Sequence, residues 1–413
     1  MKEIIANDTR LNRLPESTYR KLNERIEAAI RDRVAPTASI AIFHHDEPLL
    51  ENAWGWVDPQ SKQFPVHTST VFDLASVTKI FTATAFFSLL SEEKTTLHTP
   101  IVEVIPEFGV DAPRRIDGGQ DPHTKERMPV DTEYEGQSVD PNTITFFHLL
   151  THTSGLPPWR DLYTIADAPL EPPLSDPVSR EERWSKALER LVTYPFVGKP
   201  DNVIRYSDIG LLLLGEAVSR LHGTPGNLEE AIKDRVLKGH FRHITYNPMK
   251  NGFQRHQIAP TEDDQTWRKR RVWGEVHDEN ACAVGGIAGH AGLFAPAIEV
   301  AQFGNLWLNH VDSKLKLDPE LAGAATELQA QTGLARRGLA WMLKSPEESA
   351  AGDRFDLSTF GHTGFTGTSL WIDPTQNLVV ALLTNAVWSG RDFTELRKLR
   401  RDVHDILHEG LIR

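Results

Sequence analysis

Apolar residues recur at two different spacings along this chain, and each spacing predicts a different kind of element. Over residues 16–33 they recur every three or four positions, which predicts an amphipathic helix that ends near Pro36. The next stretch, TASIAIFHHDEPLLENAWGW, predicts two strands joined by a polar turn at residues 45–47. A mostly apolar run over residues 76–90 then predicts a second helix.

The middle of the chain alternates helical patterns with long polar stretches. Residues 109–143 are rich in Gly, Pro and Asp, and residues 157–178 are rich in proline, so both predict long loops of the kind that often form lids or binding surfaces. Helical patterns occupy residues 143–151, 181–193 and 207–222. Because few strand signals appear before about residue 270, we predict a mostly helical domain with long loops at residues 99–274.

Strand patterns return near the end of the chain in GLAWMLK, GTSLWID and NLVVALLTNA, which are short, sequential and separated by turns. The segment 391–412 then places its apolar residues on one helical face. The sequence therefore predicts an α+β fold. An antiparallel sheet flanked by N- and C-terminal helices is built from residues 1–98 and 275–413, the helical domain is inserted, and the active site lies between the two domains.

Composition narrows the classes of function. The chain has 413 residues, of which 39% are hydrophobic and 25% charged, as in a soluble protein of two domains. The net charge of -12 argues against nucleic acid or an anionic membrane surface as the main partner. The single cysteine, Cys282, excludes internal disulfides and thiolate zinc sites. No signal-like apolar region or membrane-spanning stretch is present, so we expect a cytoplasmic protein, although a secreted form trimmed of its signal would look the same.

The pattern Ser-x-x-Lys occurs three times and carries the first chemical hypothesis. Two copies, Ser91 to Lys94 and Ser313 to Lys316, lie in charged or polar surroundings. In the third, Ser76 and Lys79 lie at the start of an apolar helix, where a spacing of three places both side chains on one face. A lysine in such a poorly hydrated position has a lowered pKa and can act as a base towards the serine. The alternative is a helix-capping serine followed by a lysine that reaches solvent.

Two later motifs favour the interpretation of Ser76 as a nucleophile over its interpretation as a helix cap. Tyr206-Ser207-Asp208 opens a helical segment, and His362-Thr363-Gly364 precedes a predicted strand. In this order, the three motifs resemble those of serine β-lactamases and penicillin-binding proteins, most closely the branch of class C β-lactamases, D-alanyl peptidases and β-lactamase-like esterases. The blocks RYSDIGLLLLG, VHDENACAVGGIAGHAGLF and GHTGFTGTSLWIDP are similar, more narrowly, to a subgroup that includes amidases cleaving the muramoyl-L-alanine bond.

The resemblance implies a role for each motif residue. Ser76 would attack an acyl carbonyl, Lys79 would accept its proton, and Tyr206 would relay that proton to the leaving group. The backbone N–H groups of Ser76 and Phe365 would stabilise the oxyanion. Asp208 replaces the usual asparagine of the second motif.

The third motif, His362 with Thr363 and Gly364, would contact the substrate. Here His362 replaces the usual lysine, which weakens the expected recognition of a substrate carboxylate. His277, Asp278 and His290 either line the substrate pocket or serve structural roles in a glycine-rich turn. No histidine has a metal-ligand spacing, so we expect neither a metal nor an organic cofactor.

The resulting prediction is a serine hydrolase that forms an acyl-enzyme on Ser76 and cleaves small-molecule esters or amides. A muropeptide (N-acetylmuramoyl-L-alanine) amidase or a D-alanyl peptidase is the alternative within this class. A β-lactam-binding sensor domain that does not turn over is an alternative of a different class.

Overall fold

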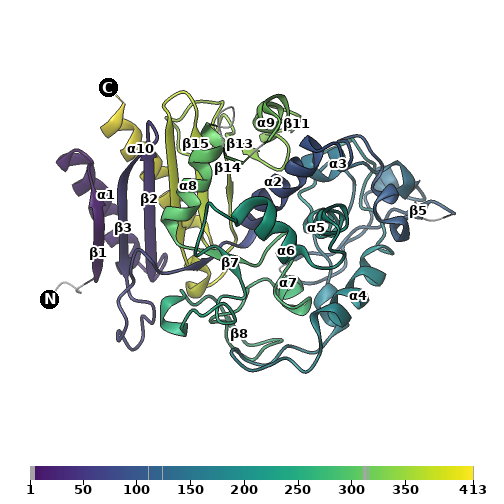
Figure 1. The fold of residues 1–413 in the computed structure, drawn as a ribbon, viewed down its shortest axis with the longest axis horizontal. Coiled ribbons are helices and arrows are strands. Elements are labelled where there is room, and N and C mark those ends of the chain that lie inside the picture. Colours follow the sequence, from purple (N-terminus) through teal and green to yellow (C-terminus); the bar gives the residue numbers. More distant parts are fainter. Residues whose placement is uncertain (1–4, 110, 123, 310–313, 316, 413) are drawn as a thin grey trace.

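A nine-stranded antiparallel sheet forms the left part of the molecule in Figure 1. The computed structural model describes residues 5–109, 111–122, 124–309, 314, 315 and 317–412. The strands follow one another in the order β1-β3-β2-β16-β15-β14-β13-β12-β11, so the two ends of the chain meet where β2 pairs with β16. Their bounds are β1 Asn7–Asn12, β2 Thr37–His44, β3 Glu47–Gly55, β11 Ala330–Thr332, β12 Ala335–Arg337, β13 Met342–Leu343, β14 Phe360–Thr363, β15 Ser369–Asp373 and β16 Leu378–Thr384.

Helices cover both faces of this sheet. On β2, Ile40 and Ile42 belong to the apolar cluster that contains buried residues of α1 (Glu16–Arg31) and α10 (Thr394–Leu411). The intervening residue Ala41 belongs to the other cluster, together with residues of α8 (Ala297–Leu308). Since successive side chains of a strand point to opposite faces, a sheet covered on both sides needs apolar residues at every position. This requirement explains the continuous apolar runs of β2 and β16.

The apolar helix α2 (Thr78–Ser91) links the sheet to the helical part of the molecule and packs against α5 (Asp208–His222). All of its residues from Thr78 to Leu89 are buried, so it has no polar face. A small sheet of β4, β10 and β7 lies at its start. The bounds of the remaining α-helices and strands are α3 Phe146–Thr151, α4 Arg180–Leu191, α6 Leu228–Ile232, α7 Glu279–Ala283, α9 Pro319–Thr326, β4 Phe72–Asp73, β5 Arg114–Arg115, β6 Ser138–Val139, β7 Thr245–Tyr246, β8 Asp263–Asp264, β9 Arg270–Arg271 and β10 Leu293–Ala295.

The predicted α+β class is confirmed, and so are the first and last helices and the β2–β3 hairpin. The sequence did not predict β1, α8 or β14. The long polar stretch 109–143 also contains a short pair of strands, β5 and β6. The domain boundaries given above stay a prediction.

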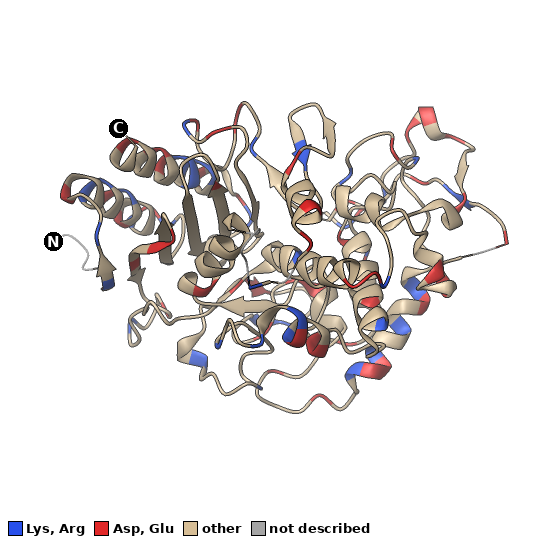
Figure 2. Cartoon of the chain, turned by 45° about the horizontal axis from the view of Figure 1, so that its top comes forward, with Lys and Arg blue, Asp and Glu red and all other residues tan. Residues whose placement is uncertain are grey.

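Among the described residues, acidic and basic side chains are interspersed, and neither sign of charge is clustered in one region. Figure 2 shows acidic and basic residues side by side on the two helices near the chain ends and along the helices on the opposite side. In the part of the chain that the structure describes, no helix has the length and apolar character needed to cross a bilayer.

Candidate active site

Ser76 lies in a sharp turn between β4 and α2. The turn is a 3-10 helix, Ala75–Val77, and α2 begins only at Thr78. Ala75 has a φ of 45°, in the left-handed region that residues with a side chain seldom adopt. Its N–H donates to the Asp73 carboxylate at 2.8 Å, which helps to hold this turn. Because Val77 is the N-cap of α2 and no side chain caps it, the interpretation of Ser76 as a helix cap is wrong.

Lys79 is buried and donates hydrogen bonds into the site. Its Nζ lies 2.7 Å from Ser76 Oγ, 2.8 Å from Asp208 Oδ1 and 3.2 Å from the backbone carbonyl oxygen of His290. An ammonium group has three protons to donate, and here three acceptors surround it. The first and second motifs therefore meet at one point, although 127 positions separate Lys79 from Tyr206 along the chain.

The pKa of Lys79 differs from our expectation. Burial alone lowers the pKa of this amine and is the largest single influence, but the Asp208 carboxylate and Tyr206 together outweigh burial and raise the pKa above its ordinary value. The predicted lowering of the Lys79 pKa is therefore wrong for the free protein. The physical reason is the carboxylate at position 208, where the related motif has a neutral asparagine.

Tyr206 lies over the lysine, among other groups that carry or can take up protons. Lys79 Nζ is 4.7 Å from the centre of its ring, and the ring of His152 is 4.6 Å away between centroids. Burial raises the pKa of the Tyr206 hydroxyl, while the charge of Lys79 opposes that shift. The tyrosine is therefore a neutral phenol next to an ammonium group in the free protein.

The third motif lies on β14, and its histidine is neutral. His362 is buried, and its Nδ1 lies 2.9 Å from the backbone carbonyl oxygen of Thr363. Burial, with Lys79 and Arg337 nearby, holds the pKa of His362 well below its ordinary value. A permanent charge is thus missing at this position, as the sequence predicted.

The turn after β14 rests directly on the turn that carries Ser76. Thr366 and Thr368 donate their hydroxyl protons to the backbone carbonyl oxygens of Asp73 and Leu74, at 2.7 and 2.9 Å. At Gly364 a Cβ atom would lie 2.5 Å from the carbonyl oxygen of Leu74, which leaves room only for glycine. The first and third motifs are therefore held in contact by threonine hydroxyls that bind backbone carbonyl groups and by the close approach of the chain at Gly364.

Sequence reasoning missed Arg337, a cation behind Tyr206. Its guanidinium carbon lies 5.3 Å from the centre of the Tyr206 ring, and the residue is buried. Nε and Nη1 are buried without a hydrogen-bond partner, and no carboxylate within the described residues pairs with this side chain. Burial lowers the pKa of the guanidinium. No motif marks this arginine, because only the pairing of β12 with its neighbours brings it to the site.

A cleft with about 820 Å³ of empty volume opens over Ser76. His277, Asp278 and His290 all line it, as one of the two sequence interpretations required. Its full lining consists of Ala75, Ser76, Pro122, Pro158, Trp159, Tyr206, Asp208, His277, Asp278, Glu279, His290, Ala291, Phe365 and Arg391.

One wall of the cleft is a chain of charged groups around His277. Its backbone N–H donates to Asp73 at 2.6 Å, and its Nε2 lies 2.9 Å from Glu262. Arg391 binds the same Glu262 carboxylate through two nitrogens at 2.8 and 2.7 Å. Burial raises the pKa of Glu262, but His277 and Arg391 outweigh it and lower the pKa to about 2. The His277 ring stacks on Phe365 at 5.5 Å between centroids, so this network supports the candidate oxyanion residue.

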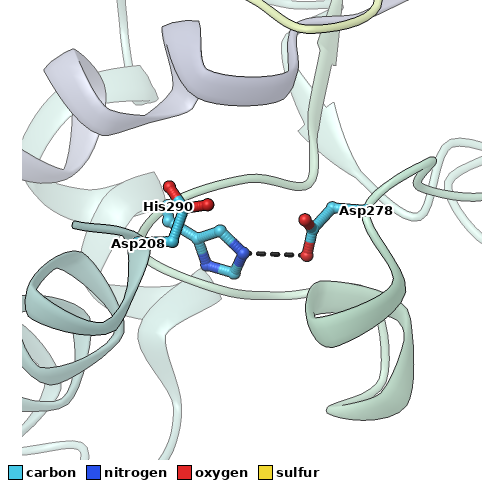
Figure 3. Close-up of side chains that lie close together, drawn as sticks. All are labelled: Asp208, Asp278 and His290. Carbon is cyan, nitrogen blue, oxygen red and sulfur yellow. Dashed lines mark hydrogen bonds and ion pairs between the residues drawn. The ribbon is translucent and has the colours of Figure 1, made fainter. Parts of the chain in front are cut away.

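The cleft lining also contains a second pair, His290 and Asp278. His290 Nε2 lies 2.8 Å from Asp278 Oδ1, and the Ala281 N–H at the start of α7 also donates to Asp278, at 2.7 Å. Although burial opposes the shift, His290 and the Ala281 N–H hold the pKa of the Asp278 carboxyl well below its usual range. Figure 3 shows Asp208 next to this pair.

Comparison with known proteins gives a consistent picture. The family model described as Beta-lactamase matches residues 22–405. The N-acetylmuramyl-L-alanine amidase of Bacillus subtilis (strain 168) is 30% identical over 404 residues, with 89% of this chain and 80% of the relative covered. A putative D-alanyl-D-alanine carboxypeptidase of Escherichia coli (strain K12) is 28% identical over 376 residues, with 85% and 78% covered.

Solved structures share the fold at lower sequence identity. EstCE1, a hydrolase with promiscuous acyltransferase activity, has a TM-score of 0.67 at 20% identity and covers 94% of this chain and 99% of its own. A class C β-lactamase from Rhodobacter sphaeroides has a TM-score of 0.61 at 17% identity, with 94% and 99% covered. The predicted β-lactamase/transpeptidase-like architecture is therefore confirmed.

Proposed function

Since this chain belongs to the β-lactamase family, we propose that it is a serine hydrolase that forms an acyl-enzyme on Ser76 and cleaves carboxylic esters or amides. The observation that carries the proposal is the 2.7 Å hydrogen bond between Lys79 Nζ and Ser76 Oγ at the floor of a cleft. A nucleophile and its proton acceptor need this hydrogen-bond contact.

The protonation of the cluster determines how Ser76 is activated. In the free protein Lys79 is an ammonium group, Tyr206 a phenol and Asp208 a carboxylate, so the cluster must lose one proton before it can take the serine proton. Because Lys79 contacts both Asp208 and the Tyr206 ring, the loss of that proton depends on all three side chains. After that loss, the lysine amine accepts the Ser76 proton while Oγ bonds to the substrate carbonyl carbon, and Tyr206 passes a proton to the leaving group as its bond breaks.

Deacylation repeats these steps with water. Water attacks the ester carbonyl, its proton enters the same cluster, and Ser76 Oγ leaves with a proton restored. The N–H groups of Ser76 and Phe365 are the proposed oxyanion donors in both stages. Two features support the second donor: the contact between the two turns at Gly364 and the stacking of Phe365 on His277.

A second candidate substrate class is the amide bond of a muropeptide. The 30% identity to an N-acetylmuramyl-L-alanine amidase over 89% of this chain favours it. The neutral His362 favours uncharged esters and amides over β-lactams, which present a carboxylate.

The experiment compares two substrates and two serine variants. Wild-type protein should turn over p-nitrophenyl butyrate or N-acetylmuramoyl-L-alanine steadily, and Ser76→Ala should lose that activity. Ser91→Ala is the matched control, because Ser91 lies three residues before Lys94 at the end of α2, where its hydroxyl donates to the Phe87 carbonyl oxygen at 2.9 Å. The remaining copy of the pattern, Ser313 to Lys316, falls outside the described residues.

Two outcomes would contradict the proposal. Equal losses in Ser76→Ala and Ser91→Ala would mean that Ser76 has no special role. A single stoichiometric burst without further turnover would instead support the sensor alternative. A serine-directed fluorophosphonate should add once per chain, and peptide mass spectrometry should locate it on Ser76.

A further inference from the structure

Three side chains that can bind metal ions meet at the cleft from three separate segments. Asp208 opens α5, Asp278 immediately precedes α7, and His290 lies just before β10. One ligand atom from each lies within 4.8 Å of the other two, and Figure 3 shows the three side chains gathered at one place. Their separation along the chain explains why no metal-ligand spacing was visible in the sequence.

We propose that Asp208, Asp278 and His290 bind one divalent transition-metal ion, with Zn²⁺ as the preferred ion, and that the bound ion inhibits the enzyme. The inhibitory part of this inference rests on the proposed function, whereas the binding part does not. Imidazole nitrogen and carboxylate oxygen are ordinary zinc ligands, and two carboxylates balance the double charge of the ion.

The distances require only a small contraction. Zinc bonds to nitrogen and oxygen of about 2.0–2.2 Å place the ligand atoms of a tetrahedral site roughly 3.4 Å apart. The three ligand atoms lie within 4.8 Å of one another, so side-chain movements on the order of 1 Å close the site.

Burial and an existing contact hold the histidine ligand in place. The His290 side chain is 2% exposed, and its Nε2 already faces the Asp278 carboxylate at 2.8 Å, so this nitrogen is the one that would bind the ion. The side chains of Asp208 and Asp278 keep 20% and 21% of their surface exposed, so an ion can reach them from the cleft.

The location of the site explains why the ion would inhibit. Asp208 Oδ1 lies 2.8 Å from Lys79 Nζ, which in turn lies 2.7 Å from Ser76 Oγ. An ion that binds Asp208 competes with the lysine for this carboxylate and occupies the cleft beside the nucleophile. Inhibition should therefore be competitive with substrate and reversed by a chelator, while the protein treated with EDTA keeps its full activity.

The experiment measures binding directly, without substrate. EDTA-treated and dialysed protein is titrated with Zn²⁺ by calorimetry and with Co²⁺ by visible absorption, which reports the coordination geometry. We expect one site per chain. Asp278→Asn and His290→Gln should each weaken Zn²⁺ binding by at least ~10-fold, since even the loss of an outer partner of a metal ligand costs about 10- to 100-fold.

A matched control tests whether the loss of any Asp–His pair would weaken Zn²⁺ binding. Asp201→Asn breaks the pair in which His148 Nε2 lies 3.1 Å from Asp201, away from the cleft lining, and it should leave the dissociation constant unchanged. Thermal unfolding of each variant verifies its fold, and Asp278→Asn preserves the side-chain shape.

Each outcome has a defined meaning. Absence of Zn²⁺ and Co²⁺ binding by the wild-type protein, or equal binding by Asp278→Asn, would overturn the site. Binding at this site without competitive inhibition would overturn its inhibitory role. If no tested substrate is hydrolysed at all, the proposed function fails, while the binding titrations still decide the metal site.

Discussion

The carboxylate of Asp208 helps to keep Lys79, the neighbour of the candidate nucleophile Ser76, protonated. Lys79 is fully buried, and burial alone would favour its neutral form. The ion pair with Asp208 at 2.8 Å, together with Tyr206, reverses this preference. One side-chain difference from the related motif, carboxylate for amide, therefore changes the form in which the free protein meets its substrate.

Replacing this carboxylate should move the pH dependence of the reaction. Asp208→Asn removes a charge that raises the pKa of Lys79, so the cluster loses its extra proton at a lower pH. The acidic limb of the kcat/KM profile should shift to lower pH by about 1–3 units. Rates with p-nitrophenyl butyrate between pH 5.5 and 10 measure the shift, with Asp201→Asn as the control. An unchanged profile would rule out Asp208 as the group that sets the pKa of Lys79.

A second residue-scale prediction concerns Lys79 itself. Lys79→Arg keeps a positive charge near Asp208 but cannot release a proton, because a guanidinium stays protonated. Its turnover should fall at least ~100-fold, within the usual range for general-base catalysis. Steady-state kinetics measure the loss, and circular dichroism verifies the fold. Near wild-type turnover would mean that the lysine is only a structural cation.

The neutral His362 leads to a prediction about substrate choice. A lost charge-assisted hydrogen bond to a carboxylate, at roughly 1.5–3 kcal/mol, lowers recognition by about 10- to 150-fold. Short uncharged esters lose nothing by comparison. We therefore expect a lower kcat/KM for nitrocefin than for p-nitrophenyl butyrate at pH 7.5. The reverse order would show that another cation binds the carboxylate, and Arg391 in the cleft lining and Arg337 beside Tyr206 are described candidates.

At the scale of elements, regular patterns were predictable and contacts between short segments were not. The helices α1 and α10 and the β2–β3 hairpin match the expectations because each has a complete apolar period. By contrast, β14 has four residues and β4 has two, which is too short for a pattern to emerge. These short strands nevertheless carry or flank the motifs.

In the candidate site, too, some contacts were predictable from the sequence and others were not. The motif residues around Ser76, Lys79 and Asp208 come together as the resemblance implied. Arg337 and the Glu262–Arg391 pair were missed, because tertiary pairing alone brings them to the cleft. The direction of the Lys79 pKa was wrong because its cause is a contact with another helix.

The contact between the first and third motifs can be tested with one methyl group. In Gly364→Ala the new Cβ would meet Thr368 Oγ1 at 2.1 Å and the Leu74 carbonyl oxygen at 2.5 Å, so the two turns must separate. We expect a loss of about 1–3 kcal/mol in unfolding free energy and a larger loss in kcat. Gly210→Ala is the control, because its Cβ would meet ordinary contacts of 3.5 Å or more within α5. Equal effects of the two variants would contradict the proposed contact.

At the scale of the whole molecule, buried histidines link stability to pH. His152, His362 and His404 are each about 1% exposed or less. Burial holds the pKa of the first two well below the ordinary value, and it lowers the pKa of His404 to about 4. In the unfolded chain these histidines take up protons near pH 6.5. Their contribution to stability is therefore complete above pH 6.5 and is lost progressively as the pH falls towards 4.

This linkage predicts a difference between two histidine variants. At pH 5.5 a histidine that stays neutral in the folded protein lowers the unfolding free energy by about 1.4 kcal/mol. His404→Gln should remove the pH-dependent contribution of this histidine. The unfolding free energy of the variant should therefore fall less than that of the wild type between pH 7.5 and 5.5. His67→Gln is the control, because the His67 side chain is 59% exposed. Asp73 acts in the opposite direction, since burial raises the pKa of its carboxyl, but it affects all three proteins equally. Guanidinium unfolding at both pH values measures the difference, and identical pH dependence in wild type and His404→Gln would show that His404 takes up its proton without unfolding.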